Sequence, residues 1–469
     1  MRQRTGQIYT DVEITNVAAE GKAMAKIDNI VVFVKGVVPG DVVDIQITHR
    51  SRNFREAKPI AFKKYSDQRA EPKCKHFGIC GGCVWQNLPY NLQLKYKQQQ
   101  VEDAFKHIAK IPIPEVSPIL PSEQQYYYRN KLEFTFASCR WLTEDEMQVP
   151  DSEKQLQGLG FHIPGRFDKV LDIKECLLQN DPSNAIRLAA KQYAIDNGLE
   201  FFNLKSQVGF LRNILIRTSL SGEVMVIMVF NEGSAEKREI MMDYLCEQFP
   251  QITSMNYFIN PKRNSDYSDL ESHCYRGKDH ITEILGDLKF KVQPKSFYQT
   301  NSKQAYNLYS VAKNFADLSG TETVYDLYTG TGTIANFVAR NAKKVVGIEY
   351  IAEAIEDAKV NSQINGITNT AFYAGDMKDV LTQDFINQNG SPDVMIIDPP
   401  RAGMHPGVVE TILAAAPSKI VYVSCNPATQ ARDAALLHQL YDVVKIQPVD
   451  MFPQTHHVEN VILMVKRSL

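Results

Sequence analysis

The 469-residue sequence contains no apolar run that approaches the roughly 20 residues a helix needs to cross a bilayer. Its first residues, MRQRTGQIYTDVEIT, lack the apolar segment of a secretory signal peptide. Internal repeats and low-complexity tracts are also missing. We therefore expect a cytoplasmic protein without a membrane partner. A chain of this length exceeds what one hydrophobic core organises, so we expect several domains.

A strong excess of one charge is also missing, because the formal net charge is only −2. The charge is nevertheless unevenly distributed. Residues 1–97 carry 16 Lys plus Arg against 9 Asp plus Glu, a balance of +7, which leaves −9 for the rest. A basic N-terminal part of this kind predicts contact with a polyanion. The alternative is a solvated basic face with no partner.

The first part of the chain has the pattern of short β-strands. VEITNVA, NIVVFVKG and DVVDIQITHR have strand propensity and are interrupted by Gly21, Gly36 and the Pro39–Gly40 turn. We predict that residues 1–66 form an OB-like β-barrel, a fold that often binds nucleic acid. Any other small β-barrel would show the same pattern.

The middle of the chain, residues 67–295, is predicted to be an α+β domain. VMVIMVF has the composition of a buried strand, and NAIRLAAKQYAIDNG that of a helix that ends at glycine. Three of the eight cysteines, Cys74, Cys80 and Cys83, lie close together in the sequence at its start. A reducing compartment disfavours disulfides, so this cluster indicates a metal or redox site.

Residues 296–469 alternate between β and α patterns, which is typical of a Rossmann-like, doubly wound sheet. DVVKIQPVD and NVILMVKR end the chain as two strands without an intervening helix, so we expect them to be antiparallel. Ligands bind such sheets at the carboxyl ends of the strands. The overall prediction is an α/β protein of three domains.

A glycine loop joins one predicted strand to a helix in this last part. Asp326 is followed by Gly330 and Gly332 in the G-x-G-x-x-A form, and Glu349 ends the next strand, where an acid can bind ribose hydroxyls. The loop alone is compatible with NAD as well as with S-adenosylmethionine.

Three carboxylates at successive strand ends favour the methyl donor. Asp326 precedes the loop and can face the sulfonium and amino group of S-adenosylmethionine. Asp376 ends the third strand, where a side chain can contact the adenine edge. Asp398 begins a DPPR segment at the fourth strand. This segment resembles the acidic-Pro-Pro loops of nucleobase methyltransferases, which place a flat base beside the methyl group.

The fifth predicted strand ends in SCNP, which contains Cys425. A cysteine in a strand is most often a small buried hydrophobe, but this one lies where the strand stops at the ligand crevice. Carbon 5 of uracil is too weak a nucleophile to attack a sulfonium unless a thiolate first adds to carbon 6. We expect surroundings that lower the pKa of the Cys425 thiol. Glu459 is the candidate base for the carbon 5 proton, and His456 or His457 could take that role instead.

These motifs resemble the RNA uracil-C5 methyltransferase family, and most of all its ribosomal-RNA branch with a TRAM domain and an iron–sulfur cluster. FYQTN, DLYTGTGT, IDPPRAG, SCNP and MFPQTHHVE carry the resemblance. It implies Cys425 as nucleophile and Glu459 as proton acceptor. It also implies that Gln299 and Tyr328 bind the donor with the glycine loop, which includes Thr333. Thr333 departs from the Asn frequent in the ribosomal branch.

The family's cluster motif is C-x5-C-x2-C with a distant fourth cysteine. The resemblance therefore implies a 4Fe–4S cluster on four thiols, with zinc as the alternative for a four-cysteine site; the ligands would be Cys74, Cys80, Cys83 and Cys176. The cysteines outside the known motifs, Cys139, Cys246 and Cys274, are interpreted as packing residues.

The function that the resemblance implies is methylation of 23S ribosomal RNA to 5-methyluridine by a monomeric enzyme. The target uridine must leave its stack, and Phe297, Tyr328 and Phe452 are candidates for stacking on unpaired bases. The alternatives are a transfer RNA methyltransferase and an RNA-binding protein that has lost catalysis. A nicotinamide-dependent oxidoreductase would leave SCNP without a purpose.

Overall fold

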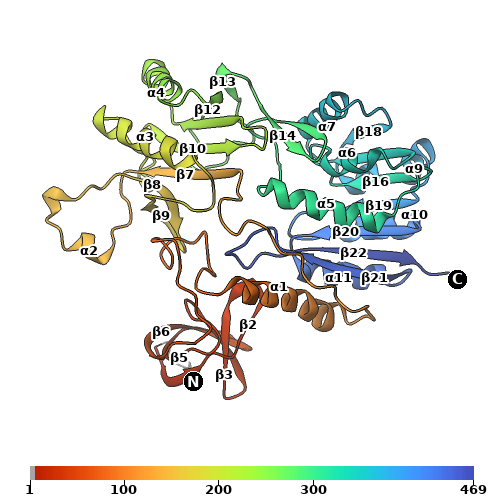
Figure 1. Cartoon of the computed structure of the whole chain (residues 1–469), viewed down its shortest axis with the longest axis horizontal. Coiled ribbons are helices and arrows are strands. Elements are labelled where there is room, and N and C mark those ends of the chain that lie inside the picture. The colour runs from red at the N-terminus through yellow and green to blue at the C-terminus, as the bar shows by residue number, and fades with distance from the viewer. Residues whose placement is uncertain (1–5, 469) are drawn as a thin grey trace.

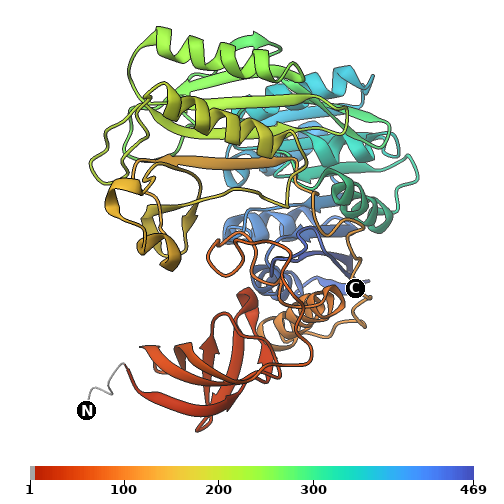
Figure 2. The same ribbon diagram turned by 60° about the vertical axis from the view of Figure 1, so that its left-hand side comes forward.

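The structure is a computed structural model that describes residues 6–468. It is a mixed α/β fold, as the sequence predicts, with an N-terminal β-sheet, a central sheet and a C-terminal sheet (Figure 1). The N-terminal sheet meets the C-terminal part at the turn before β3, where Gly21 lies against His456, and through the segment that follows the sheet (Figure 2). In the described part of the chain, no helix has both the length and the apolar character that crossing a membrane requires.

The N-terminal sheet has six strands in the order β1-β5-β6-β4-β3-β2. Alternation of apolar and polar residues buries one face of each strand, and Val32, Val43 and Ile45 are among its fully buried side chains. The predicted strands NIVVFVKG and DVVDIQITHR form β4 and β5, whereas the predicted strand VEITNVA covers the end of β1, a break and β2. The strand bounds are β1 (Ile8–Glu13), β2 (Asn16–Val17), β3 (Ala23–Ile27), β4 (Ile30–Val34), β5 (Val42–Arg50) and β6 (Phe54–Lys64).

Helix α1 (Tyr90–Ala104) connects the N-terminal part to the C-terminal sheet. Its buried residues Val101 and Ala104 belong to the same hydrophobic cluster as the strands of that sheet. In Figure 1 the helix lies between the red N-terminal strands and the blue C-terminal strands. The chain thus crosses the molecule before the central sheet begins.

The central sheet has seven strands in the order β13-β12-β11-β10-β7-β8-β9. VMVIMVF forms β11 (Val224–Phe230), which is buried along its whole length, and the predicted helix is α3 (Ser183–Asp196). Helices α3 and α4 (Ala235–Gln248) pack together (Figure 1). The other bounds are β7 (Lys131–Ala137), α2 (Glu144–Met147), β8 (Gly158–Ile163), β9 (Arg166–Asp172), β10 (Leu211–Thr218), β12 (Ile252–Ile259) and β13 (His273–Gly277), followed by a hairpin of β14 (Ile281–Leu285) and β15 (Leu288–Val292).

The C-terminal sheet has seven strands in the order β18-β17-β16-β19-β20-β22-β21. Strands β16 to β20 are parallel, whereas β22 pairs antiparallel with both β20 and β21, which confirms the prediction for the chain end. The bounds are α5 (Ser302–Ala316), β16 (Thr323–Leu327), α6 (Thr333–Ala339), β17 (Lys344–Glu349), α7 (Ala352–Ile364), β18 (Thr370–Ala374), α8 (Met377–Val380), α9 (Gln383–Asn389), β19 (Val394–Ile397), α10 (Pro406–Ala415), β20 (Lys419–Ser424), α11 (Pro427–Leu437), β21 (Tyr441–Val449) and β22 (Glu459–Lys466).

Strand order places the predicted functional segments along one edge of this sheet. β16 lies between β17 and β19, and β19 pairs with β20. The glycine loop, the DPPR segment and the SCNP turn follow three neighbouring parallel strands, so they meet at the carboxyl edge. The reversal of chain direction in β22 brings its first residue, Glu459, to the same edge.

Candidate active site

The glycine loop after β16 has the geometry that only glycine tolerates at one of its positions. Gly332 has φ +76°, and a Cβ there would lie 2.8 Å from the Cβ of Ala358. Gly330 also has a positive φ of +54°, and its N–H donates to Glu349 Oε2 at 3.1 Å. The end of β17 and the loop are therefore joined directly, and Glu349 stands where the sequence predicted it.

Asp326 lies beneath this loop and is fully buried. Its Oδ2 accepts hydrogen bonds from the Thr329 hydroxyl and from the Ala335 N–H, while its buried Oδ1 has no hydrogen-bond partner among residues 6–468. Burial raises the pKa of Asp326 to about 7. An unpartnered buried carboxyl oxygen fits a site for a cationic or hydrogen-bond-donating ligand.

The remaining residues predicted to bind the donor lie near the carboxyl edge of the C-terminal sheet. Thr333 is the first residue of α6 and is buried, and Gln299 is buried just before α5. Tyr328 is half-buried in the loop with φ +65°. Asp376 follows β18 and caps α8, where its carboxylate accepts from the Lys378 N–H at 3.2 Å.

Asp398 follows β19 and is half-buried beside the loop. Burial, followed by repulsion from Asp326, raises its pKa to about 7. Asp326 therefore lies close enough to act on Asp398, and no cation among residues 6–468 is a cause of either shift. A ligand with positive charge would compensate both.

Cys425 lies at the end of β20 in a turn that is fixed to the DPPR loop. Asn426 caps α11 and donates through Nδ2 to the Arg401 carbonyl at 3.0 Å, and the Thr429 hydroxyl donates to the same carbonyl at 3.3 Å. Cys425 is a free thiol that is neither fully buried nor fully exposed. It is therefore not part of the packed core.

The electrostatic surroundings of Cys425 differ from the expectation. We expected a lowered pKa, but burial raises the pKa of the thiol to about 11, and the charges of Glu459 and Asp398 add to this effect. The Arg401 guanidinium acts in the opposite direction. The expectation was wrong because the sequence shows which groups lie near the strand ends but not how many acids face the thiol.

Glu459 is the first residue of β22 and is only 4% exposed. Burial raises its pKa to about 8, repulsion from Asp398 contributes, and Arg401 opposes the shift. A carboxyl with a pKa near neutrality can both accept and release a proton under working conditions. Glu459 and Cys425 also influence each other's charge, so the structure brings these two predicted residues together.

The two competing histidines lie in the segment before Glu459 and are half-buried. Burial lowers the pKa of His457 to about 3 and also lowers that of His456. Both rings are therefore neutral near pH 7. Their ring centroids lie 4.1 Å apart, and the His457 ring stands edge-on to Phe452 at 6.3 Å.

Arg401 is the functional candidate that sequence reasoning missed. Its side chain is exposed, and its charge acts on Cys425, Glu459 and both histidines. The sequence could have indicated this role, because the arginine of DPPR is a cation just after a strand end where the other charged side chains are acids.

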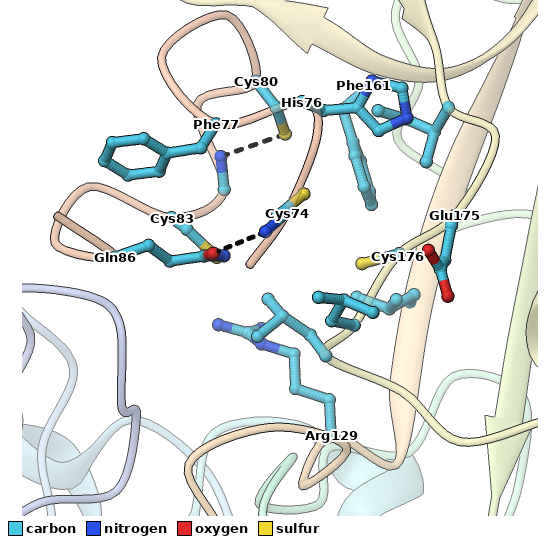
Figure 3. A pocket seen from close by; sticks show the side chains of 15 residues that line it. Cys74, His76, Phe77, Cys80, Cys83, Gln86, Arg129, Phe161, Glu175 and Cys176 are labelled. Carbon is cyan, nitrogen blue, oxygen red and sulfur yellow. Dashed lines mark hydrogen bonds between the residues drawn. The ribbon is translucent and has the colours of Figure 1, made fainter. Parts of the chain in front are cut away.

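A second site is formed by the four cysteines predicted to bind a cluster. Their side chains converge on one cavity of about 140 Å³, from two loops 90 residues or more apart in the sequence (Figure 3). All four are free thiols, and the rest of the lining combines apolar side chains with the polar or charged residues His76, Gln86, Arg129 and Glu175. Burial raises the pKa of Cys80 to about 11 and that of Cys83 to about 12. Within residues 6–468, no three His, Cys, Asp or Glu side chains are grouped tightly enough to hold a single metal ion.

The cysteines outside this site differ from their interpretation as packing residues. Cys246 is partly buried against the central core, in agreement with it. Cys139 and Cys274 are exposed, so the interpretation was wrong for these two. Cys139 lies just beyond the end of β7, and Cys274 lies on the edge strand β13.

Two family models match the chain. The tRNA (uracil-5-)-methyltransferase model matches residues 218–467, more than half of the chain, and the TRAM domain model matches residues 2–60. The chain belongs to the tRNA (uracil-5-)-methyltransferase family. It is an S-adenosylmethionine-dependent RNA methyltransferase with an N-terminal TRAM domain.

Similar proteins extend over the whole chain. An uncharacterized RNA methyltransferase of Bacteroides thetaiotaomicron is 58% identical over 96% of this chain and 100% of its own length. One of Porphyromonas gingivalis is 54% identical over 97% and 100%. Among solved structures, the tRNA (uracil-54, C5)-methyltransferase of Pyrococcus abyssi, in complex with S-adenosyl-L-homocysteine, covers 97% of this chain and 99% of its own. It has a TM-score of 0.76 and 29% identity.

Proposed function

We propose that this family member methylates carbon 5 of a uridine in 23S ribosomal RNA, with Cys425 as nucleophile and Glu459 as proton acceptor. The observation that carries the proposal is the meeting of a free thiol and a buried carboxyl of raised pKa at the strand edge that also holds the glycine loop. A non-catalytic RNA-binding protein would have no use for such a pair.

S-adenosylmethionine supplies the methyl group as a sulfonium when it is bound. The glycine loop and Glu349 would hold its ribose, Gln299, Tyr328, Thr333 and Asp376 would surround the rest of it, and Asp326 and Asp398 would face its positive charge. The unpartnered Asp326 Oδ1 fits this assignment. So do the raised pKa values of both aspartates, since no cation in the described part of the chain acts on them.

In the proposed reaction, the Cys425 thiolate forms a bond to carbon 6 of uracil, and the electron pair of the 5,6 double bond moves to make an enolate. Carbon 5 of the enolate would take the methyl carbon, and the broken carbon–sulfur bond would leave its electron pair on the neutral thioether of S-adenosylhomocysteine. Glu459 then removes the carbon 5 proton, the double bond re-forms, and the thiolate leaves carbon 6. Arg401 favours the thiolate form because its positive charge opposes the two acids.

The uridine must leave its stack to reach this edge, which costs a few kcal/mol. Phe297 is 69% exposed beside Gln299 and can stack on an unpaired base. Tyr328 and Phe452 are half-buried and would contact a base only at its edge. The basic TRAM part would hold flanking phosphates.

The choice of 23S ribosomal RNA rests on the resemblance of the four-cysteine motif to the ribosomal-RNA branch. Transfer RNA is the second candidate, because the similar Pyrococcus abyssi protein acts on tRNA uracil-54 by its name. The test is to incubate the protein with the donor and, separately, with unmodified 23S ribosomal RNA and transfer RNA. Formation of 5-methyluridine in 23S RNA alone supports the proposal, whereas formation in transfer RNA alone assigns the second candidate.

We propose further that the cysteine cavity holds a 4Fe–4S cluster on Cys74, Cys80, Cys83 and Cys176. Four thiols around a cavity fit a cluster, whereas zinc would draw four sulfurs to about 2.3 Å from one ion. Iron and sulfide analysis of anaerobically purified protein tests it, with about four of each per chain expected and stoichiometric zinc as the contradicting result.

A further inference from the structure

The loop 450–458 between β21 and β22 leads directly into Glu459 and is held from outside at four consecutive carbonyls. Four consecutive loop carbonyls accept hydrogen bonds from four segments that are distant in the sequence. Met451 O accepts from Asn301 Nδ2 at 2.9 Å, Phe452 O from Lys97 Nζ at 3.0 Å, Pro453 O from the Tyr128 hydroxyl at 2.9 Å, and Gln454 O from the N–H groups of Val84 and Trp85 at 2.9 and 3.1 Å.

Lys97 makes the charged contact in this set. Its ammonium forms an ion pair with Asp450 Oδ1 at 2.6 Å, and both side chains are fully buried. The same Asp450 oxygen accepts from the Phe452 N–H at 3.1 Å, and Oδ2 accepts from the Tyr90 hydroxyl at 2.8 Å. Lys97 thus bridges a side chain and a main-chain carbonyl of one tight turn.

A neighbouring residue of α1 holds the next part of the loop. The side-chain amides of Gln93 and Gln454 are joined at 3.0 Å, and the Gln454 N–H donates to Gln93 Oε1 at 2.9 Å. Gln454 has φ +68°, a conformation that a residue with a Cβ adopts only when its surroundings hold it there. Helix α1 therefore determines the shape of the loop at two points.

Only the ring-bearing side chains of the loop are partly exposed to solvent. Phe452, His456 and His457 are its half-exposed side chains, whereas the other residues from Asp450 to Val458 are buried. The Phe452 ring also lies 5.4 Å from the Arg129 guanidinium. A loop that presents three rings beside Glu459 and is fixed by its main chain is pre-organised to receive a flat base.

Stability alone does not account for a buried Lys–Asp pair. The loss of hydration of two charges often equals or exceeds their attraction, and apolar residues of similar size frequently replace such pairs without loss of stability. What the pair supplies is a defined geometry, since both charges must remain in contact with their partners. That geometry is located at the turn that begins the catalytic loop.

We propose that Lys97 is a positioning residue for uridine methylation, which holds the Asp450–Phe452 turn so that the rings of the loop and Glu459 face the target base. The proposal rests on the proposed function of Glu459. Lys97 acts through the loop and does not touch the substrate. The cross-over of α1 is therefore part of the catalytic apparatus, although it lies outside the C-terminal sheet.

The test compares the native protein with the double variant Lys97→Met, Asp450→Asn, which removes both charges and leaves none unpaired. Lys95→Met is the matched control, because Lys95 is an exposed lysine on the same helix. We measure the thermal unfolding midpoint, the Kd for S-adenosylhomocysteine, the KM and kcat with RNA, and the steady-state fraction of protein joined to RNA. Asp450→Asn alone is the second variant, since it keeps the shape of the side chain.

For the folded double variant we expect kcat to fall about tenfold or more, because a displacement near 1 Å costs on the order of 100-fold. The Kd for S-adenosylhomocysteine should stay unchanged, and the protein–RNA fraction should rise because elimination is slowed. Asp450→Asn should show a smaller loss of kcat, with the same unchanged Kd and raised protein–RNA fraction.

A kcat within twofold of native in the folded double variant, or in Asp450→Asn if the double variant does not fold, overturns the positioning role. A loss of the same size in Lys95→Met also overturns it. If the native protein forms no 5-methyluridine, the proposed function fails. If the native protein is active and only the positioning variants behave as native, the positioning role alone fails.

Discussion

Glu459 should destabilise the folded state near neutral pH, and its replacement by glutamine should make the protein more stable. A carboxyl whose pKa is raised in the folded state binds its proton more tightly there than in the unfolded chain. Stability therefore falls as the pH rises from the ordinary value of 4.5 to the folded value of about 8. Below pH 4.5 both states are protonated and the penalty disappears.

The size of the effect follows from these two values. At pH 7 the unfolded carboxyl is ionised and the folded one is largely protonated, and the interval from 4.5 to 7 at about 1.36 kcal/mol per unit amounts to about 3 kcal/mol. Glu459→Gln keeps the shape of the side chain and cannot ionise. It should therefore raise the free energy of unfolding by about 3 kcal/mol at pH 7 and leave it nearly unchanged at pH 4.5.

Thermal unfolding of native protein and Glu459→Gln at these two pH values is the assay. Glu410→Gln is the control, since Glu410 is exposed on α10. The same variant should lose turnover by a factor of about 100 to 10,000, the usual contribution of a positioned base. An unfolding midpoint that is unchanged or lower at pH 7, or a gain that is equal at both pH values, would refute the burial argument.

Three further predictions concern the same edge of the sheet and the RNA. Cys425→Ala should abolish methylation and leave S-adenosylhomocysteine binding within about twofold in calorimetry, since the thiol acts only in the covalent step; normal turnover would remove its role. The affinity for S-adenosylmethionine should rise between about pH 6 and pH 8 more steeply than that for S-adenosylhomocysteine, because Asp326 and Asp398 ionise near pH 7 and only the former ligand carries a sulfonium; equal pH slopes would contradict this. RNA affinity measured by filter binding should fall steeply with added salt, since basic side chains hold phosphates, and a salt-independent affinity would exclude the charged N-terminal part from binding.

The sequence predicted the arrangement of the catalytic edge because the periodic β/α pattern determines where strands end. The glycine loop, DPPR and SCNP each follow a predicted strand, and the structure places them on neighbouring strands. Glu459 was predicted to lie in the linker between the last two strands, whereas it is the first residue of β22, which returns antiparallel to that edge. The assignment of roles to these residues stays a proposal, as do the domain limits at residues 66 and 295.

Interactions between segments that are distant in the chain could not be predicted from the sequence. The pair of Lys97 with Asp450 joins residues 353 positions apart, and nothing in the periodicity of either segment indicates a buried charge. The raised pKa of Cys425 was missed for a similar reason, because it depends on the number of carboxylates that face one sulfur atom. Burial of polar groups is a property of the packed molecule, and motif spacing does not report it.

The central claim is that Cys425 becomes bonded to carbon 6 of the target uracil. The most direct measurement is to incubate Glu459→Gln with S-adenosylmethionine and substrate RNA, digest the complex, and locate the RNA-linked peptide by mass spectrometry. We expect a methylated uracil attached to Cys425, which accumulates because the carbon 5 proton is not removed. A methylated RNA product with no protein attached, or an adduct on any other residue, would contradict it.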